Sequence, residues 1–310
     1  MMAPSASRVV RYRVEFGVRD YDLATTLDSG QAFRWTRHGE VWAGVVRGRW
    51  LALRQAAEPD RIVAETVEDP GDWHWLRDYL RVDEDLATVL ATFPDDRPMT
   101  AAVAACRGLR LLRQEPWECL ASFLLSSTKQ IPQIQAGVRN LSERFGERVQ
   151  APAGGAAVFA FPEARVLAGV SESELRECRI GFRARYLRET AEAVAGGAFP
   201  IGDIGRLPLD EARERLVTLP GVGPKIADCV LLFAYGFARA FPVDVWVMRA
   251  LRELYFTGRR PTAARLKAFS ETHFGPNAGY AQQYLFHHAR MRAGRVANRR
   301  DEEGEKAHDN

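Results

Sequence analysis

The segment 219–229, which reads LPGVGPKIADC, constrains the fold of this chain more than any other. An amphipathic stretch at 208–219 precedes it with acidic residues in its first turn, and an apolar stretch at 226–235 follows it. Both patterns are typical of helices. Gly221 and Gly223 allow a tight turn between the two helices and the close approach of another molecule. The sequence therefore predicts a helix-hairpin-helix.

The start of the second helix has the character of an anion site. Pro224 suits the first helical position, where no backbone N–H is needed, and the free N–H groups of this turn can bind a phosphate. The helix dipole disfavours a cation there, so we expect a lowered pKa for the Lys225 amine, which suits Schiff-base chemistry. Two interpretations of Lys225 stay open: a nucleophile, or a lysine that binds phosphate. The chain has 4 lysines against 39 arginines, which favours the first.

A second candidate lies in the sequence FPVDVWVMR, which begins at Phe241. Asp244 precedes an apolar helical run and suits an N-cap. A helix over 224–235 is roughly 18 Å long at ~1.5 Å per residue. The extended segment 236–243 reaches up to about 26 Å at ~3.3 Å per residue. The chain can therefore return along the helix and place Asp244 beside Lys225, where a carboxylate could also stabilise developing positive charge.

The combination of LPGVGPKIADC and PVDVW resembles the active-site signature of the helix-hairpin-helix DNA glycosylases, most closely the 8-oxoguanine DNA glycosylase/AP lyase family. The likeness covers about residues 27–290. It implies an enzyme that flips 8-oxoguanine out of duplex DNA, with Lys225 as the Schiff-base nucleophile that expels the base and Asp244 as the electrostatic stabiliser. Strand cleavage by β-elimination would follow. No metal would perform the chemistry, and a monovalent cation is a candidate ligand of the hairpin at Gly221 and Gly223.

The resemblance also implies a pocket for the flipped base. The sequence DSGQAFRW matches the family's SGQxFRW motif, in which the carbonyl of the residue equivalent to Gly30 accepts the N7 hydrogen that guanine lacks. The sequence GYAQQYLF matches GxAQxxLF, so Gln282 would bind the Watson–Crick edge of the base. Phe286 and Cys229 would lie against its two faces. Without the resemblance, Gly30 is a turn glycine, and Gln282 and Phe286 are a helix face that meets the core.

Several further positions are implied as DNA contacts. Phe182 lies among arginines at 176, 179, 183, 185 and 188, a pattern that alone is typical of a solvated helix start. By the resemblance, Phe182 is the apolar wedge that fills the gap left by the flipped base, and Arg183 binds the base left unpaired. The chain departs from the family pattern where Thr128 and Lys129 replace paired asparagines, where Gln133 replaces an arginine, and where Trp246 replaces a histidine. We expect a weaker preference for the opposite base.

The remaining sequence predicts an α+β protein. Segments with alternating polarity, joined by turns at 37–39 and 47–48, predict an antiparallel sheet from strands at 8–16, 32–36, 41–46 and 50–54. From residue 72 the pattern is helical. We therefore predict an N-terminal antiparallel sheet domain at 1–95, a mostly helical domain with the helix-hairpin-helix at 96–292, and a disordered tail at 293–310.

Composition excludes some classes of protein. With 310 residues, 46% of them hydrophobic, and a net charge of +3, the chain is typical of a mildly basic globular protein. Its four cysteines lack CxxC spacing, and none follows Cys229, which excludes the relatives that carry an iron–sulfur loop there. No apolar run approaches a membrane span and the start lacks a signal-peptide core, so we expect an intracellular, DNA-associated monomer.

Two other functions compete with this one. An alkylated-base DNA glycosylase hydrolyses the same bond with an aspartate and no lysine nucleophile. The partner in our interpretation is damaged double-stranded DNA, whereas a non-catalytic helix-hairpin-helix protein would only grip DNA phosphates. Lys225 argues against the first, and its combination with Asp244, Gly30, Gln282 and Phe286 argues against the second.

Overall fold

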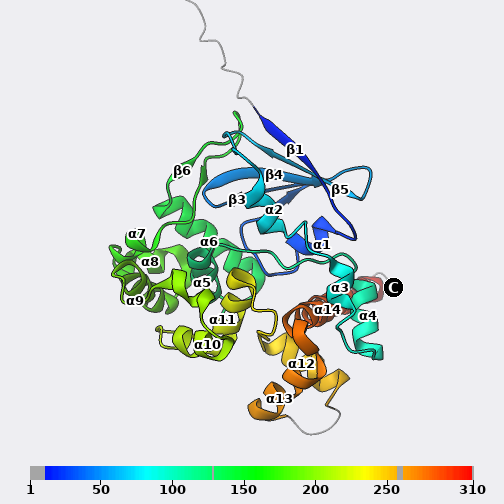
Figure 1. Ribbon diagram of the computed structural model, residues 1–310. Coiled ribbons are helices and arrows are strands. Elements are labelled where there is room, and N and C mark those ends of the chain that lie inside the picture. Colours follow the sequence, from blue (N-terminus) through cyan, green and yellow to red (C-terminus); the bar gives the residue numbers. More distant parts are fainter. Residues whose placement is uncertain (1–10, 128, 257–260, 309–310) are drawn as a thin grey trace, which may run out of the picture.

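The protein, seen here as a computed structural model, is described over residues 11–127, 129–256 and 261–308. A β-sheet forms one side of the molecule, and most of the helices form the other side (Figure 1). The predicted α+β class is confirmed: an antiparallel sheet comes first in the chain and a mostly helical part follows. Within these ranges no helix is both long enough and apolar enough to cross a membrane.

Five antiparallel strands make up the N-terminal sheet in the order β1-β5-β4-β3-β2. Their bounds are β1 (Tyr12–Gly17), β2 (Thr36–His38), β3 (Val41–Val46), β4 (Arg49–Gln55) and β5 (Arg61–Thr66). The predicted turn at 47–48 joins β3 to β4, with φ of 49° at Arg47 and 74° at Gly48. Two positive φ values in a two-residue loop match the right-handed twist of the strands that it connects.

The predicted strand at 32–36 is wrong, because only Thr36 belongs to a strand. Two side chains that would share one face of a strand pack into different cores: Phe33 packs into the cluster of the helices, and Trp35 packs into the cluster of the sheet. The Trp35 ring lies flat on β3, since a Cβ added at Gly44 would approach it to 2.6 Å. An alternating sequence here reflects two cores on opposite sides of an irregular segment, not a pleated strand.

The helices form the larger part of the molecule. In chain order they are α1 (Leu23–Leu27), α2 (His74–Leu80), α3 (Leu86–Leu90), α4 (Arg97–Ala105), α5 (Pro116–Leu124), α6 (Ile131–Phe145), α7 (Ala164–Ala168), α8 (Glu172–Leu175), α9 (Arg183–Ala195), α10 (Leu209–Val217), α11 (Pro224–Val230), α12 (Val245–Leu254), α13 (Ala263–His273) and α14 (Ala278–His308). A two-stranded ribbon of β6 (Arg148–Val149) and β7 (Val158–Phe159) accompanies them. Helix α11 packs against α5, and α12 packs against α14.

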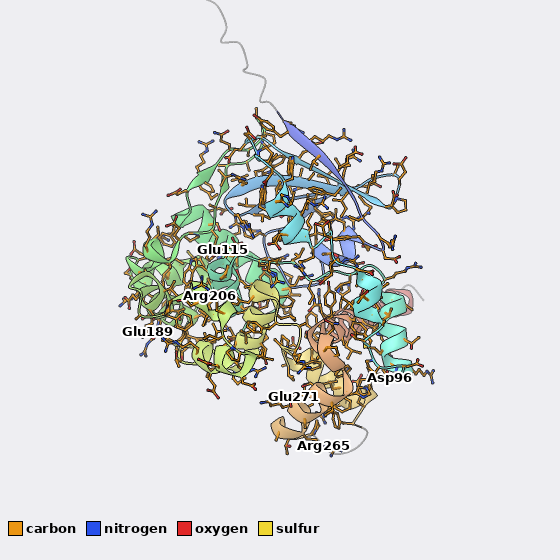
Figure 2. All side chains as sticks on the ribbon, viewed as in Figure 1. Asp96, Glu115, Glu189, Arg206, Arg265 and Glu271 are labelled. Carbon is orange, nitrogen blue, oxygen red and sulfur yellow. The ribbon has the colours of Figure 1, made fainter. Side chains whose placement is uncertain are left out.

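Asp96, labelled in Figure 2, ties three helices together. Its carboxylate caps α4 by accepting from the Met99 N–H at 2.8 Å. It also accepts from the Tyr255 hydroxyl at 3.0 Å and lies 2.8 Å from His273 Nε2. These contacts link the start of α4 to the ends of α12 and α13. Helix α12 is also the helix whose N-cap is Asp244.

The end of the chain differs from the prediction. We predict a disordered tail at 293–310, but α14 continues as a helix to His308. This segment is rich in alanine, arginine and glutamate, which have high helix propensity, and it extends a helix whose earlier turns are anchored by buried Tyr284 and Leu285. The boundary at 95/96 stays a prediction, although Leu86 and Val89 of α3 already pack with the helical core.

Candidate active site

The hairpin between α10 and α11 has the predicted turn, and its two glycines do different things. Gly221 has a φ of 76°, and a Cβ added there would lie 2.7 Å from Cγ of Tyr186. Both the backbone and the space therefore require glycine. Gly223 has a φ of −94°, and no atom lies within 4 Å of its Cβ position. The protein's own packing does not require glycine at 223, and the hairpin surface is open there.

A partly buried ion pair fixes the two helices of this element. Arg213 Nε on α10 donates to Asp228 Oδ1 on α11 at 2.7 Å. Burial raises the pKa of the Asp228 carboxyl, and the nearby Arg213 charge opposes that rise. Asp228 follows Lys225 by three positions, so this pair holds the first turn of α11 in a set orientation.

Lys225 lies in the first turn of α11 and points toward α5. Its Nζ donates to Ser126 Oγ at 2.8 Å and lies 5.4 Å from the ring centroid of Phe123. Ser126 Oγ in turn donates to the Phe123 carbonyl at 2.6 Å, which leaves an oxygen lone pair free to accept from the amine. Our sequence analysis missed Ser126 and Phe123. Ser126 begins the segment 126–129, which reads SSTK and contains the predicted DNA contacts Thr128 and Lys129, and Phe123 lies three positions before it.

Asp244 holds the first of the two roles considered for it, and its second role stays a prediction. It is the N-cap of α12, where its Oδ1 accepts from the Val247 N–H at 2.8 Å. Burial raises the pKa of its carboxyl, while the Val247 N–H and the charges of Lys225 and Arg290 lower it. The carboxylate therefore lies within the electrostatic field of Lys225, as the chain-length argument predicts.

A cavity of about 540 Å³ brings the predicted catalytic and base-pocket positions together. Its wall draws on the sheet part, on α5, on α11, on the start of α12 and on α14, which lie far apart in the sequence. All six predicted positions line it: Gly30, Lys225, Cys229, Asp244, Gln282 and Phe286. The sequence prediction of which residues meet is therefore confirmed, while their chemical roles stay predictions.

The cavity lining suits a flat, polar ligand. Gln282 is almost fully buried, and its Oε1 has no hydrogen-bond partner among the residues that the structure describes. Burial raises the pKa of the Cys229 thiol to about 12, so this face of the cavity is uncharged at neutral pH. Gly30 has a φ of 80°, and a Cβ added there would lie 2.5 Å from Ile131 Cδ1. A side chain at position 30 would therefore disturb this wall.

The glutamine of the SGQ motif is structural. Gln31 is fully buried, its Nε2 donates to the Arg110 carbonyl at 2.8 Å, and its Oε1 accepts from the Leu112 N–H at 2.8 Å. In a neighbouring hydrogen bond, Gln283 Nε2 on α14 donates to the Ser29 carbonyl at 3.0 Å. These bonds hold the Gly30 turn against the helical part of the molecule.

The predicted wedge stands free at the surface. Phe182 is 56% exposed, at the start of α9. Arg183 lies behind it, only 4% exposed, with its Cζ 4.4 Å from the Phe182 ring centroid. The neighbouring arginines form ion pairs along their helices with glutamates: Arg176–Glu172, Arg185–Glu189 and Arg188–Glu192, of which Glu189 is labelled in Figure 2. Much of the arginine cluster is therefore neutralised, and Phe182 is its distinctive feature.

The remaining predicted DNA contacts have mixed placements. Thr128 lies outside the described residues. Lys129 lines the cavity and donates to the Arg179 carbonyl at 2.6 Å, and burial lowers the pKa of its amine. Gln133 is exposed, and its Oε1 accepts from the Gln130 N–H at 3.0 Å at the start of α6. Trp246 is 38% exposed and lines both the cavity and an adjoining groove.

That groove has a volume of about 1040 Å³ and continues from the cavity along α12. Lys225 and Asp244 line both spaces, so they stand where the groove opens into the cavity. Arg249 and Arg252 of α12 also line the groove. A polymeric substrate could therefore lie in the groove while one of its units enters the cavity.

Comparisons with known proteins agree with this geometry. Residues 13–120 match the N-terminal domain of 8-oxoguanine DNA glycosylase, and residues 121–276 match the HhH-GPD superfamily of base excision DNA repair proteins. The chain is 32% identical to N-glycosylase/DNA lyase OGG1 of Arabidopsis thaliana over 286 residues, 85% of this chain and 76% of that protein. It is 31% identical to N-glycosylase/DNA lyase of Saccharomyces cerevisiae over 258 residues, 75% of this chain and 68% of that one.

A solved structure is similarly close. It shows the 8-oxoguanine glycosylase/lyase of Clostridium acetobutylicum in complex with double-stranded DNA that contains cytosine opposite to 8-oxoG. The two folds agree with a TM-score of 0.83 at 29% identity, over 90% of this chain and 98% of that one. The chain therefore belongs to the 8-oxoguanine DNA glycosylase/lyase family, within the helix-hairpin-helix superfamily of base excision DNA repair proteins.

Proposed function

We propose that this protein is a bifunctional DNA glycosylase/AP lyase that excises 8-oxoguanine from duplex DNA through a Schiff base at Lys225. One observation carries the proposal: Lys225 and Asp244 stand at the junction of a groove and a cavity. The groove suits the backbone of the damaged strand, and the cavity suits one flipped base. The names of the relatives, which are N-glycosylases/DNA lyases, support the same activity.

The flipped base would be recognised first by Gln282. Its Oε1 is buried and has no hydrogen-bond partner among the described residues, at a cost of ~1–3 kcal/mol, so a base that donates hydrogen bonds to it relieves that cost. The N1 and N2 hydrogens of 8-oxoguanine are such donors. The uncharged Cys229 thiol and the Phe286 ring offer two faces between which a planar base can stack. The Gly30 carbonyl would then accept the N7 hydrogen that guanine lacks.

The chemistry follows from the pair at the junction. The neutral Lys225 amine attacks C1′ of the sugar, and the C1′–N9 bond breaks with its electron pair remaining on the base. Asp244 stabilises the positive charge that develops on the sugar ring. The bound amine then loses a proton as the ring opens to the imine, which acidifies C2′ and allows elimination of the 3′ phosphate. The hydrogen bond to Ser126 Oγ holds the amine at this position.

The duplex would be held by three surface features. The open hairpin at Gly223 and the first-turn N–H groups of α11 suit a backbone phosphate. Phe182 would fill the stack that the flipped base leaves. A monovalent cation at the hairpin remains part of the proposal. We also propose that the protein acts as a monomer on DNA inside the cell.

The test is borohydride trapping on a duplex with a single 8-oxoguanine. The unaltered protein should form a covalent adduct, and Lys225→Gln should form none while it still binds the duplex. Lys267→Gln is the matched control, because Lys267 lies on α13 among exposed acidic partners, away from the cavity. An adduct with Lys225→Gln would refute the assignment. Base release without any adduct from the unaltered protein would favour a hydrolytic glycosylase instead.

A further inference from the structure

Arg290 stands inside the base cavity, one turn of α14 beyond Phe286. Its Nη1 donates to the Asp28 carbonyl at 3.3 Å, and its Cζ lies 5.6 Å from the Phe286 ring centroid. The same Nη1 would lie 3.1 Å from a Cβ added at Gly30. The guanidinium therefore bridges the Gly30 turn and the aromatic ring, which are two walls of the cavity.

Within the residues that the structure describes, the charge of Arg290 is not matched by a direct ion pair. Its guanidinium donates to the Asp28 backbone carbonyl, and no carboxylate of the described residues lies within ion-pair distance. Burial lowers the pKa of its guanidinium, but arginine stays protonated at neutral pH. A guanidinium has five N–H donors, so the bond to Asp28 leaves donors for a ligand. A partly buried cation with unused donors in a cavity wall favours a ligand that carries negative charge or acceptor oxygens.

We propose that Arg290 contacts the flipped base and stabilises the negative charge that the base gains as it leaves. The inference rests on the proposed function, because it takes the base to lie against Phe286 with its N7 edge at Gly30. In that pose the guanidinium faces the imidazole edge of the purine, where 8-oxoguanine carries its O8 acceptor. Undamaged guanine has no oxygen at that edge.

The electron balance of the reaction places negative charge on the departing base, which such a group can stabilise. The lone pair of the Lys225 amine forms the new bond to C1′, and the pair of the C1′–N9 bond stays on the base, which departs as an anion. Its charge spreads over the ring nitrogens and the O6 and O8 oxygens. Arg290 donates hydrogen bonds to this anion without giving up its proton, and the base takes a proton from water afterwards. Charge that develops only in the transition state is the kind that a fixed cation stabilises.

In this arrangement Asp244 and Arg290 would stabilise opposite charges on different parts of the substrate. Asp244 lies on the sugar side of the cavity and meets the positive charge on the ring. Arg290 lies on the base side, against Gly30 and Phe286, and meets the negative charge. Each charge also reaches the other, since Arg290 lowers the pKa of the Asp244 carboxyl. A substrate that lacks a base should therefore need Lys225 but not Arg290.

The experiment compares Arg290→Met with the unaltered protein on two duplexes. Methionine keeps an unbranched apolar stem beside Phe286 and removes the charge. On a duplex with 8-oxoguanine, single-turnover base release should fall by about 100-fold or more, as expected for the loss of a positioned electrostatic group. On a duplex with a preformed abasic site, strand cleavage and borohydride trapping should stay within about twofold, since no base departs. Arg290→Lys should recover part of the excision rate.

Controls separate the possible failures. Arg292→Met removes an exposed arginine of the same helix and should leave both reactions unchanged. An equal loss on both duplexes would overturn the inference, because Arg290 would then act on the fold or on the DNA backbone. Unchanged excision by Arg290→Met would overturn it as well. If the unaltered protein released no 8-oxoguanine, the proposed function would fail first, and the inference would fail with it.

Discussion

Replacing either hairpin glycine by alanine adds one methyl group, and we expect the two substitutions to affect different properties. The change at Gly221 should lower the stability of the fold, and the change at Gly223 should weaken DNA binding. At Gly221 the φ of 76° disfavours any other L-residue by ~1–2 kcal/mol. The new Cβ would also lie 2.7 Å from Cγ of Tyr186, and overpacking of that kind costs about 1–3 kcal/mol. Gly221→Ala should therefore destabilise the fold by roughly 2–5 kcal/mol, the sum of the two effects.

Gly223→Ala should behave in the opposite way. The φ of −94° suits alanine, and no atom lies within 4 Å of the new Cβ. Loss of glycine's freedom in the unfolded chain should leave stability unchanged or raise it by up to about 1 kcal/mol. The methyl group would, however, stand where a phosphate approaches the N–H groups of α11. A lost hydrogen bond to a charged group is worth about 1.5–3 kcal/mol, so duplex binding should weaken by roughly 10–150-fold.

Two measurements decide this prediction. Urea unfolding gives the stability of each variant, and fluorescence anisotropy with a duplex that carries an abasic-site analogue gives Kd. We expect Gly221→Ala to lose stability and Gly223→Ala to lose affinity alone. If Gly223→Ala bound the duplex as tightly as the unaltered protein, the hairpin would not be the phosphate site. If Gly221→Ala kept full stability, the turn would have relaxed and the packing argument would be wrong.

Three other predictions concern the site and its support. Asp244→Asn keeps a capping oxygen for α12 but removes the charge, so single-turnover excision of 8-oxoguanine should fall by about 100-fold or more. Near-normal excision would show that Asp244 acts only as a helix cap. Excision should tolerate adenine, guanine or thymine opposite the lesion, because Gln133 both donates and accepts hydrogen bonds where arginine only donates, and Gln133→Arg should sharpen the preference for cytosine. Rates from four duplexes with different opposite bases test this, and a cytosine preference above roughly 100-fold in the unaltered protein would contradict it. Finally, burial raises the pKa of Glu118 from 4.5 to about 7, although Arg34 opposes the rise. The folded state then binds the extra proton between these values, so stability should fall as pH rises from 5 to 8. Urea unfolding should show a loss up to about 2–3 kcal/mol larger than in Glu118→Gln, and parallel pH profiles would refute the assignment.

The sequence predicted the local elements best where a single physical pattern controls them. The hairpin at 219–224 follows from glycine, proline and two helical stretches, and β3 was predicted with its observed bounds. Strand β5 was missed because it lies between β1 and β4, where Ile62, Val63 and Ala64 are all buried. A central strand of this kind shows no alternation of polar and apolar residues.

The site was predictable only in part, for a different reason. Asp244 could be placed beside Lys225 by chain length, but the base pocket was placed through the family resemblance. Ser126 and Arg290 gave no signal of their own, because their importance comes from where the fold brings them. Ser126 lies 99 positions before its partner Lys225. Arg290 is one of 39 arginines, so composition cannot single it out.

Two kinds of effect act in opposite directions on the pKa of the Asp244 carboxyl at the wall of the cavity. Burial alone favours the protonated acid, yet a protonated acid could not stabilise positive charge on a sugar ring. Capping α12 opposes the effect of burial, since the Val247 N–H donates to the carboxylate and the positive end of the helix dipole lies beside it. Lys225 and Arg290 add positive charge from α11 and α14. In the proposed mechanism the cap would therefore serve the reaction as well as the helix, because the backbone hydrogen bond that begins α12 favours the charged form of the carboxyl.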